Sequence, residues 1–150
     1  MVIRKAARKD ELSLIELIER TGETREKAVK RVSSVNSDGR LILVLEENSK
    51  LIGYVRVSQQ DQDQNVNSFV DLAHYACLNW IGVDPDFRKR GNGSKLVLSC
   101  DEIAKEWHKV GIWLDCRGKV IPFYTSNGYK IRGSYFDEEK PRYVMAKKFS

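Results

Sequence analysis

The chain has 150 residues, of which 41% are hydrophobic and 31% are charged, and its formal net charge is +5. This length suits one folded unit, and the apolar content excludes a disordered protein, so we expect residues 1–150 to form a single domain. No apolar run is long enough to cross a membrane, and residues 1–20 lack the uninterrupted apolar core of a secretory signal. We therefore expect a cytoplasmic protein without a membrane partner.

Hydrophobic periodicity and turn signals divide the chain into strands and helices. The predicted elements, in chain order, are a strand at 2–4, helices capped by Asp10 and Thr24, strands at 41–45 and 51–57 joined by a turn at 47–50, a strand at 73–83, a helix ended by Gly111, a strand at 112–116, a short helix around 123–124, and strands at 129–134 and 143–147. The helix that starts at Thr24 is expected to make contacts as far as Val35 and to stop at Asp38. This order predicts an α/β protein with a mixed sheet and helices on its faces.

Residues 59–67 contain one apolar residue in nine and are expected to form a mobile loop without packed structure. The three cysteines, Cys77, Cys100 and Cys116, are widely spaced, so we expect buried thiols and no disulfide framework. The two histidines, His74 and His108, stand in no ligand motif, and we expect no metal.

The positive net charge indicates an anionic partner, either a nucleic acid or a polyphosphate cofactor. The basic residues are scattered, and no recognition motif accompanies them, so we expect no nucleic-acid partner. The stretch 83–96 instead places a glycine-containing turn between a strand and a helix. Gly91 and Gly93 would let the backbone approach an anion closely, and the first N–H groups of the helix would point at it. The spacing fits neither the dinucleotide-binding nor the P-loop motif.

This turn resembles the acetyl-CoA signature V-x-P-x-x-[RQ]-x-x-G-x-[GA] of the GNAT superfamily of N-acetyltransferases. The matching residues are Val83, Pro85, Arg88, Gly91 and Gly93. A second match to the family, F-Y-x-x-x-G-[FY], is formed by Phe123, Tyr124, Gly128 and Tyr129. The resemblance implies a mixed, mostly antiparallel sheet of about seven strands with helices on both faces. It also implies acetyl-CoA as cofactor, CoA as product, no metal, and possible homodimers.

The resemblance also implies roles for individual residues. Tyr124 would protonate the departing CoA sulfur, because a phenol is a neutral proton donor at pH 7. The backbone N–H at Gly82 would polarise the thioester carbonyl, while 81–83 would pair with the pantetheine arm and 90–94 would hold the pyrophosphate. The implied cofactor-binding residues are Ile81, Val83, Arg88, Lys89, Arg90, Gly91, Asn92, Gly93 and Ser94. Arg117 departs from the family, which often has an Asn at this position, and we expect its guanidinium to reach a CoA phosphate or an anionic substrate.

The acceptor side is less typical of the family. Asn79 and Cys77 occupy the positions where related enzymes often carry Glu or His, and neither is an ordinary base at pH 7. A water chain is therefore expected to take the amine proton. Candidate substrate-binding residues are Asp71, Cys77, Asn79 and Trp80.

We expect direct transfer of an acetyl group, in a ternary complex, from acetyl-CoA to a primary amine of a small molecule. Two alternatives stay open. One is an N-acetyltransferase of proteins or peptides, and the other is a catalytically silent acyl-CoA sensor. The acceptor, and whether the acyl group is strictly acetyl, are left undetermined at this point.

Overall fold

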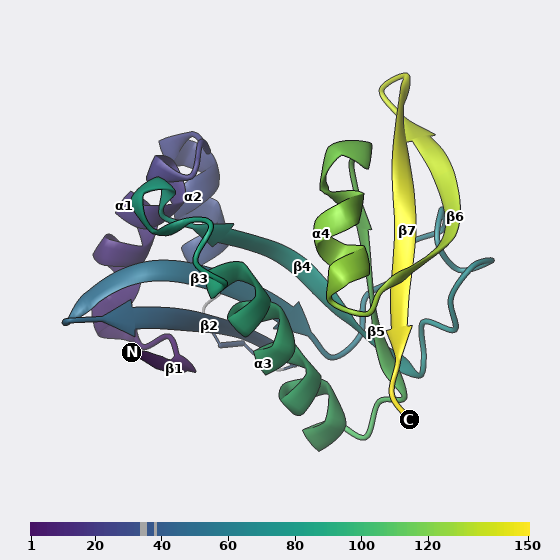
Figure 1. The fold of residues 1–150 in the computed structure, drawn as a ribbon, viewed down its shortest axis with the longest axis horizontal. Helices are drawn as coiled ribbons and strands as arrows, with labels where there is room; N and C mark the ends of the chain where they lie inside the picture. Colours follow the sequence, from purple (N-terminus) through teal and green to yellow (C-terminus); the bar gives the residue numbers. More distant parts are fainter. Residues whose placement is uncertain (34–35, 38) are drawn as a thin grey trace. The chain divides into compact units, whose positions relative to one another are not determined.

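A computed structural model describes residues 1–33, 36–37 and 39–150 of the chain. They fold into two compact units (Figure 1). Unit one comprises Met1–Val57 and Asn79–Ser99, and unit two comprises Ser58–Leu78 and Cys100–Ser150. Strand β4 (Tyr75–Val83) and helix α3 (Asn92–Glu106) each contribute residues to both units. That 1–150 act as one domain stays a prediction.

Unit one contains the strands β1 (Val2–Lys5), β2 (Arg40–Glu47) and most of β3 (Lys50–Ser58). β1 pairs with β2 in antiparallel register, from Val2 opposite Glu46 to Lys5 opposite Leu43. Asn48 and Ser49 close the β2–β3 hairpin with φ values of 50° and 64°. Two consecutive positive φ values match the right-handed twist of a hairpin, and the turn predicted at 47–50 is confirmed.

Helices α1 (Glu11–Arg20) and α2 (Arg25–Val32) cover one face of these strands. Their shared core consists of Ala6, Leu14, Leu17, Ile18, Ala28, Val32, Ile42, Val44, Leu51 and Tyr54. The start of α3 packs on the opposite face, because a Cβ on Gly53 would lie 2.9 Å from the Leu96 side chain, and Gly53 alternates with Tyr54 along β3. Helices on both faces, as the resemblance implies, are thus present within unit one.

The predicted cap at Thr24 is confirmed, since its side chain accepts a hydrogen bond from Lys27 N at 3.2 Å. The helix contacts expected at Val35 and the stop expected at Asp38 lie outside the described residues.

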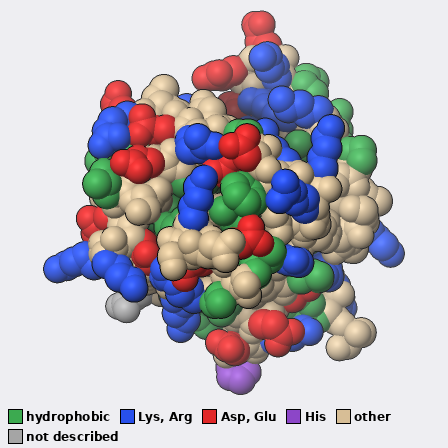
Figure 2. Space-filling view, turned by 60° about the vertical axis from the view of Figure 1, so that its left-hand side comes forward, with side chains coloured by type: hydrophobic (Ala, Val, Ile, Leu, Met, Phe, Trp, Pro, Cys, Tyr) green, Lys and Arg blue, Asp and Glu red, His purple; other side chains and the backbone are tan. Residues whose placement is uncertain are grey.

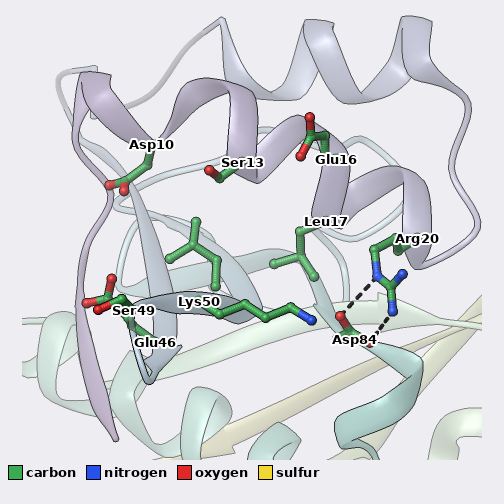
Figure 3. A pocket seen from close by; sticks show the side chains of 10 residues that line it. Asp10, Ser13, Glu16, Leu17, Arg20, Glu46, Ser49, Lys50 and Asp84 are labelled. Carbon is green, nitrogen blue, oxygen red and sulfur yellow. Dashed lines mark hydrogen bonds and ion pairs between the residues drawn. The ribbon is translucent and has the colours of Figure 1, made fainter.

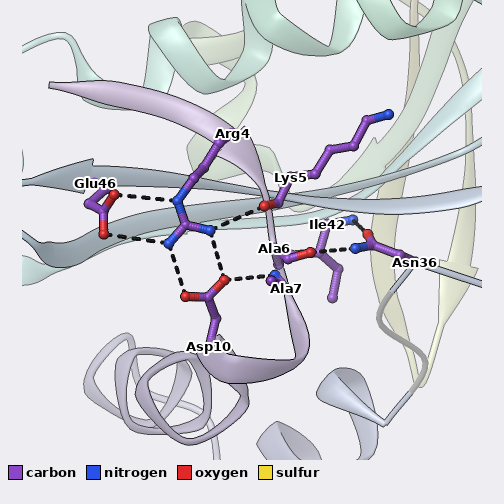
Figure 4. Close-up of polar contacts among 8 residues, drawn as sticks. All are labelled: Arg4, Lys5, Ala6, Ala7, Asp10, Asn36, Ile42 and Glu46. Atoms are coloured by element: carbon purple, nitrogen blue, oxygen red, sulfur yellow. Dashed lines mark hydrogen bonds and ion pairs between the residues drawn. The ribbon is translucent and has the colours of Figure 1, made fainter.

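Asp10 stands at the N-cap position of α1, as predicted, but its side chain does not cap this helix. Within the described chain, its carboxylate accepts no hydrogen bond from α1. It instead accepts one from Ala7 N at 2.7 Å and two from Arg4, at 2.8 and 2.9 Å (Figure 4). Arg4 also donates a hydrogen bond to Glu46 on β2 at 3.3 Å. The Arg4 guanidinium therefore takes the Asp10 carboxylate away from the helix N–H groups and links the start of α1 to β1 and β2.

Unit two contains β5 (Gly111–Cys116), α4 (Ile121–Ser126), β6 (Lys130–Asp137) and β7 (Lys140–Lys148). The first residues of β4 run parallel to β5, with Tyr75 opposite Gly111 and Cys77 opposite Trp113. β7 pairs with β5 and with β6 in antiparallel register. The predicted strands at 129–134 and 143–147 are therefore too short at the turn that joins them, because β6 and β7 extend further toward each other.

Residues 59–67 form a loop without helix or strand, as predicted, but one of its residues is packed, which corrects the prediction that nothing in this loop packs. Val66 is completely buried, and Val70 and Leu72 lie in the same core cluster as Trp113 and Cys77. Val66, the single apolar residue of 59–67, therefore attaches this polar segment to the core. The free energy gained by burying Val66 offsets part of the entropic cost of ordering the segment.

Taken along the shared strand β4, the hydrogen-bonded order of the strands is β1-β2-β3-β4-β5-β7-β6. The β4–β5 pair is parallel, whereas β1–β2, β5–β7 and β6–β7 are antiparallel. The predicted mixed sheet of about seven strands is confirmed.

Candidate active site

The turn between β4 and α3 has the backbone shape that an anion site needs. After the 3₁₀ turn Pro85–Phe87, Lys89 and Gly91 adopt positive φ values of 62° and 80°. The Arg88 Nε atom donates a hydrogen bond to Val83 O at 2.9 Å and so ties the turn to the end of β4. A Cβ at Gly91 would meet no atom within 4 Å, which means that the space beside this residue is open.

Asn92 holds the turn from inside. Its side chain, in a residue only 3% exposed, donates a hydrogen bond from Nδ2 to Phe87 O at 2.9 Å. The first bond from α3 back to the turn runs from Lys95 N to Gly91 O at 3.1 Å. The N–H groups of the first helical residues have no earlier carbonyl within the helix to bond, so they are available to an anion. The Asn92 side chain itself is committed to the turn.

Four basic residues in or next to this turn are exposed: Arg88, Lys89, Arg90 and Lys95. Arg90 and Lys50 also lie over the Phe87 ring, each 5.4 Å from its centroid. The turn thus combines fixed N–H dipoles with exposed cations, which suits a polyphosphate group.

Asp84, which sequence reasoning missed, stabilises the start of the turn through its hydrogen bonds. Its carboxylate is fully buried and accepts hydrogen bonds from Arg20 at 3.0 and 2.9 Å and from Asp86 N at 3.0 Å. Its own N–H donates to Ile52 O at 2.8 Å. The bonds from Arg20 hold the pKa of Asp84 below its ordinary value. The sequence around Asp84 shows only a strand followed by Asp-Pro. It gives no hint of the pairing with Arg20, which lies 64 residues away.

A cavity of about 250 Å³ opens next to Asp84, between α1 and the β2–β3 turn (Figure 3). Arg20, Ser13 and Glu16 line it from α1, and Lys50 points into it toward Asp84 (Figure 3). Apart from Asp84 itself, the cavity shares no residue with the turn 83–94 among the described residues.

The end of β4 belongs to unit one, and 79–83 are half-buried there. Gly82 lies under the Tyr54 phenol, since a Cβ at this position would be 2.5 Å from the Tyr54 hydroxyl. That hydroxyl is 2.9 Å from Thr21 Oγ1, which fixes the ring. Packing against Tyr54 therefore explains why a glycine occupies this position. The role of its N–H as an oxyanion donor stays a prediction.

Trp80 lies on the same half-buried part of β4 as Asn79. The Trp80 indole contacts Tyr54 edge to face, with ring centroids 5.7 Å apart. Two guanidinium groups lie close to the indole, with Arg31 Cζ 5.1 Å and Arg56 Cζ 5.6 Å from the ring centroid. Trp80 therefore combines a core contact with a polar, cationic surrounding.

Tyr124 lies in unit two, on the short helix α4, as predicted. The residue is 7% exposed, and its ring packs edge to face against Tyr129, with centroids 5.8 Å apart. Burial, followed by the nearby Cys116 and Cys100, raises the pKa of the Tyr124 phenol far above its ordinary value. The phenol is therefore neutral at pH 7 and carries a proton to donate.

The other predicted residues of unit two are engaged locally. Arg117 donates to the carbonyls of Lys140 and Pro141, at 3.2 Å each, and to Asp137 at 3.2 Å. These bonds hold its guanidinium at the β6–β7 turn, so its predicted contact with a CoA phosphate gains no support. Asp71 pairs with His74 at 2.7 Å on the surface.

The predictions for the cysteines are confirmed, because Cys77, Cys100 and Cys116 are all buried thiols outside any disulfide. Burial raises the pKa of the Cys100 thiol far above its ordinary value. In the part of the chain that the structure describes, no group of three His, Cys, Asp or Glu residues could hold a metal ion. None of the described helices is both long and apolar enough to cross a membrane.

Comparisons with known proteins agree with this arrangement. The family model described as an acetyltransferase (GNAT) domain matches residues 38–131. An uncharacterized N-acetyltransferase of Methanocaldococcus jannaschii is 34% identical over 90 residues, which cover 58% of this chain. The match covers only 38% of that relative's length.

Several solved structures share the fold. An aminoglycoside 6'-N-acetyltransferase complexed with coenzyme A has a TM-score of 0.80 and 18% identity, covering 99% of this chain and 97% of that one. The PaiA N-acetyltransferase of Thermoplasma acidophilum, in complex with coenzyme A, has a TM-score of 0.75 and 20% identity, covering 99% and 98%. A ribosomal-protein-alanine N-acetyltransferase of Brucella melitensis has a TM-score of 0.76 and 18% identity, covering 99% and 100%.

The mixed sheet and the glycine turn before α3 agree with the family match. The chain belongs to the family of GNAT acetyltransferase domains. Both elements of the sequence resemblance, the turn at 83–94 and the helix that carries Tyr124, are formed.

Proposed function

We propose that the protein transfers an acetyl group from acetyl-CoA to a primary amine of a small molecule, directly and within a ternary complex. The turn 83–94 carries this proposal, because the positive φ of Gly91, the open space beside it and the N-terminus of α3 together suit a pyrophosphate. Acetyl-CoA supplies the thioester whose acyl carbon the amine attacks.

Unit one would bind and orient the cofactor. The N–H groups at 90–94 would hold the pyrophosphate, with Arg88, Lys89 and Arg90 adding positive charge. The half-buried backbone of 81–83 would pair with the pantetheine arm in the manner of an added strand. The Gly82 N–H would then polarise the thioester carbonyl.

Tyr124 would supply the proton. As the carbon–sulfur bond breaks, the neutral Tyr124 phenol would donate its proton to the sulfur. Ring contacts with Phe123 and Tyr129 hold the Tyr124 side chain in place. A water chain would take the proton that the attacking amine loses, because Cys77 is buried and Asn79 is not a base.

The fold does not distinguish acceptors, since it is shared by an aminoglycoside and a ribosomal-protein-alanine N-acetyltransferase. We favour a small amine because no sequence feature marks an extended groove for peptides. A nucleic-acid partner is disfavoured, since Figure 2 shows Lys and Arg side chains scattered among Asp and Glu on the visible face. A cytoplasmic location and a homodimer remain predictions.

A silent acyl-CoA sensor is the second candidate, because positions 77 and 79 lack a carboxylate or a histidine. Thiol release from acetyl-CoA, measured with polyamines, amino sugars, aminoglycosides, amino acids and N-terminal peptides, separates the two. Turnover with one of these amines supports the transferase. If no amine is acetylated but CoA raises the melting temperature, the protein is a sensor. If CoA leaves the melting temperature unchanged, the assignment of the turn is wrong.

A further inference from the structure

The cavity between α1 and the β2–β3 turn lies wholly within unit one (Figure 3). Its first wall is one face of α1, since residues three or four positions apart lie on the same side of a helix. The residues of this wall are Ser13, Glu16, Leu17 and Arg20. The opposite wall comes from the β2–β3 hairpin, with Glu46, Ser49, Lys50 and Leu51. At about 250 Å³, the cavity is smaller than the roughly 300–1,000 Å³ of sites for drug-sized ligands, so it suits a small molecule.

Most charged side chains of this lining already have a partner of opposite charge. Arg20 donates to the Asp84 carboxylate at 3.0 and 2.9 Å. Asp10 and Glu46 both accept from Arg4, which stands outside the cavity, at 2.8 and 3.3 Å. Because two carboxylates share one guanidinium there, that end of the cavity keeps an excess of negative charge.

Glu16 and Lys50 are the two charged lining residues that form no ion pair within the described part of the chain. Glu16 is exposed on α1. The Lys50 ammonium lies 5.4 Å from the Phe87 ring centroid, a cation–π contact that does not use up its three N–H donors. It points toward Asp84, whose carboxylate already accepts three hydrogen bonds (Figure 3). One spare carboxylate and one spare ammonium group therefore line the same cavity from opposite walls.

The cavity is also polarised along its length. Figure 3 shows Asp10 and Glu46 at one end. The Lys50 ammonium lies at the other end (Figure 3). Leu17 and Leu51, both buried, add apolar surface to the lining, which suits the carbon chain of a ligand. An ion of a single sign would pair with only one of the two spare groups, whereas a molecule with both charges pairs with each.

We infer that the cavity binds a small zwitterion, with the ammonium group of the ligand on Glu16 and its carboxylate on Lys50. An amino acid is the simplest ligand of this class. The ligand is distinct from the proposed acceptor, because none of the lining residues belongs to 79–83, the part of β4 expected to face the thioester. The inference does not depend on acetyl transfer, since binding is measured without acetyl-CoA.

The first test varies the ligand. Glycine, β-alanine, γ-aminobutyrate and δ-aminovalerate separate the two charges by increasing lengths of chain. Each is compared with its amide, which lacks the carboxylate, and with its N-acetyl derivative, which lacks the ammonium group. In calorimetric titrations of the native protein, at least one zwitterion is expected to bind at least 10-fold more tightly than both of its derivatives. Equal binding of a derivative, or no binding of any zwitterion in the series, overturns the inference.

The second test assigns each ligand group to its residue. Glu16→Gln and Lys50→Gln are each expected to weaken binding of the zwitterion about 10-fold or more. Glu16→Gln should also remove the preference over the N-acetyl derivative and keep the preference over the amide, whereas Lys50→Gln should do the reverse. Glu11→Gln on α1 and Lys30→Gln on α2 are the matched controls, because both residues are exposed and neither lines the cavity. An equal loss of affinity in the controls contradicts a site at Glu16 and Lys50.

Thiol release from acetyl-CoA separates this cavity from the acceptor site. The zwitterion bound in the cavity is expected to raise the melting temperature without releasing thiol. A zwitterion that is acetylated, and whose binding is unchanged in Glu16→Gln, occupies the acceptor site instead. That result overturns the inference and supports the proposed function. Binding that depends on Glu16 and Lys50, in a protein that acetylates no amine, supports the inference and removes the proposed function.

Discussion

Arg20, in the last turn of α1, donates two hydrogen bonds to the buried carboxylate of Asp84, the first residue after β4. The same carboxylate caps the 3₁₀ turn that follows, by accepting from Asp86 N. One buried group thus links α1 to the start of the turn proposed to hold the pyrophosphate. Both residues lie in unit one.

Replacing Asp84 with Asn is expected to lower the free energy of unfolding by about 2 kcal/mol, because a charged acceptor is lost and a buried polar group is left mismatched. Urea unfolding followed by circular dichroism measures the change. Asp86→Asn is the control, since Asp86 also contacts Arg20, at 3.2 Å, but is 76% exposed in its side chain. Its effect should stay below about 0.5 kcal/mol.

Stability should fall in acid partly through Asp84. Its pKa is lowered in the folded state from an ordinary value of 3.8, chiefly by the bonds from Arg20. The charged carboxylate therefore stabilises the fold above that value, and the contribution is lost as the pH falls through the lower folded-state pKa. The difference in stability between the native protein and Asp84→Asn should be largest near neutral pH and should shrink as the pH falls below 3.8. A difference that stays constant over this range contradicts the assignment.

Gly82→Ala should destabilise the protein by about 1–3 kcal/mol, because the new Cβ would overlap the Tyr54 phenol. The cost should shrink in a Tyr54→Ala background, which a double-mutant cycle on thermal unfolding measures. Gly91→Ala is the matched comparison, because its Cβ meets open space and only the φ of 80° opposes it. Its cost, about 1–2 kcal/mol, should not depend on Tyr54.

Asn92 should matter for cofactor affinity more than for the chemical step. Asn92→Ala releases Phe87 O and loosens the turn, so KM for acetyl-CoA is expected to rise about 10-fold with little change in kcat. Asn92→Asp should raise KM further, because it also loses the donor and adds a negative charge near the pyrophosphate. Steady-state kinetics with acetyl-CoA as the varied substrate provide the measurement. A fall in kcat at constant KM would mean that the turn does not bind the cofactor.

Much of the fold could be predicted because its signals are local. Alternating apolar residues mark the strands, Thr24 caps α2 through a residue three positions away, and the hairpin at 47–50 follows from its turn formers. The glycine turn and the helix with Tyr124 were also found from short motifs.

What could not be predicted depends on residues far apart in the chain. Asp10 looks like a helix cap, but Arg4 on the neighbouring strand takes its carboxylate. Val66 looks isolated in a polar segment, but it is buried in the core of unit two. The pairing of Arg20 with Asp84 spans 64 positions, and no spacing rule connects them.

The proton donated by Tyr124 is the central chemical claim, and Tyr124→Phe tests it most directly. With the best acceptor at saturation, the rate of thiol release from acetyl-CoA should fall about 10²–10⁴-fold, while KM for acetyl-CoA stays close to the native value. Because burial raises the pKa of this phenol, the native rate should not decline at alkaline pH through loss of the Tyr124 proton. A variant that folds and turns over at the native rate would contradict the role of Tyr124 as the acid.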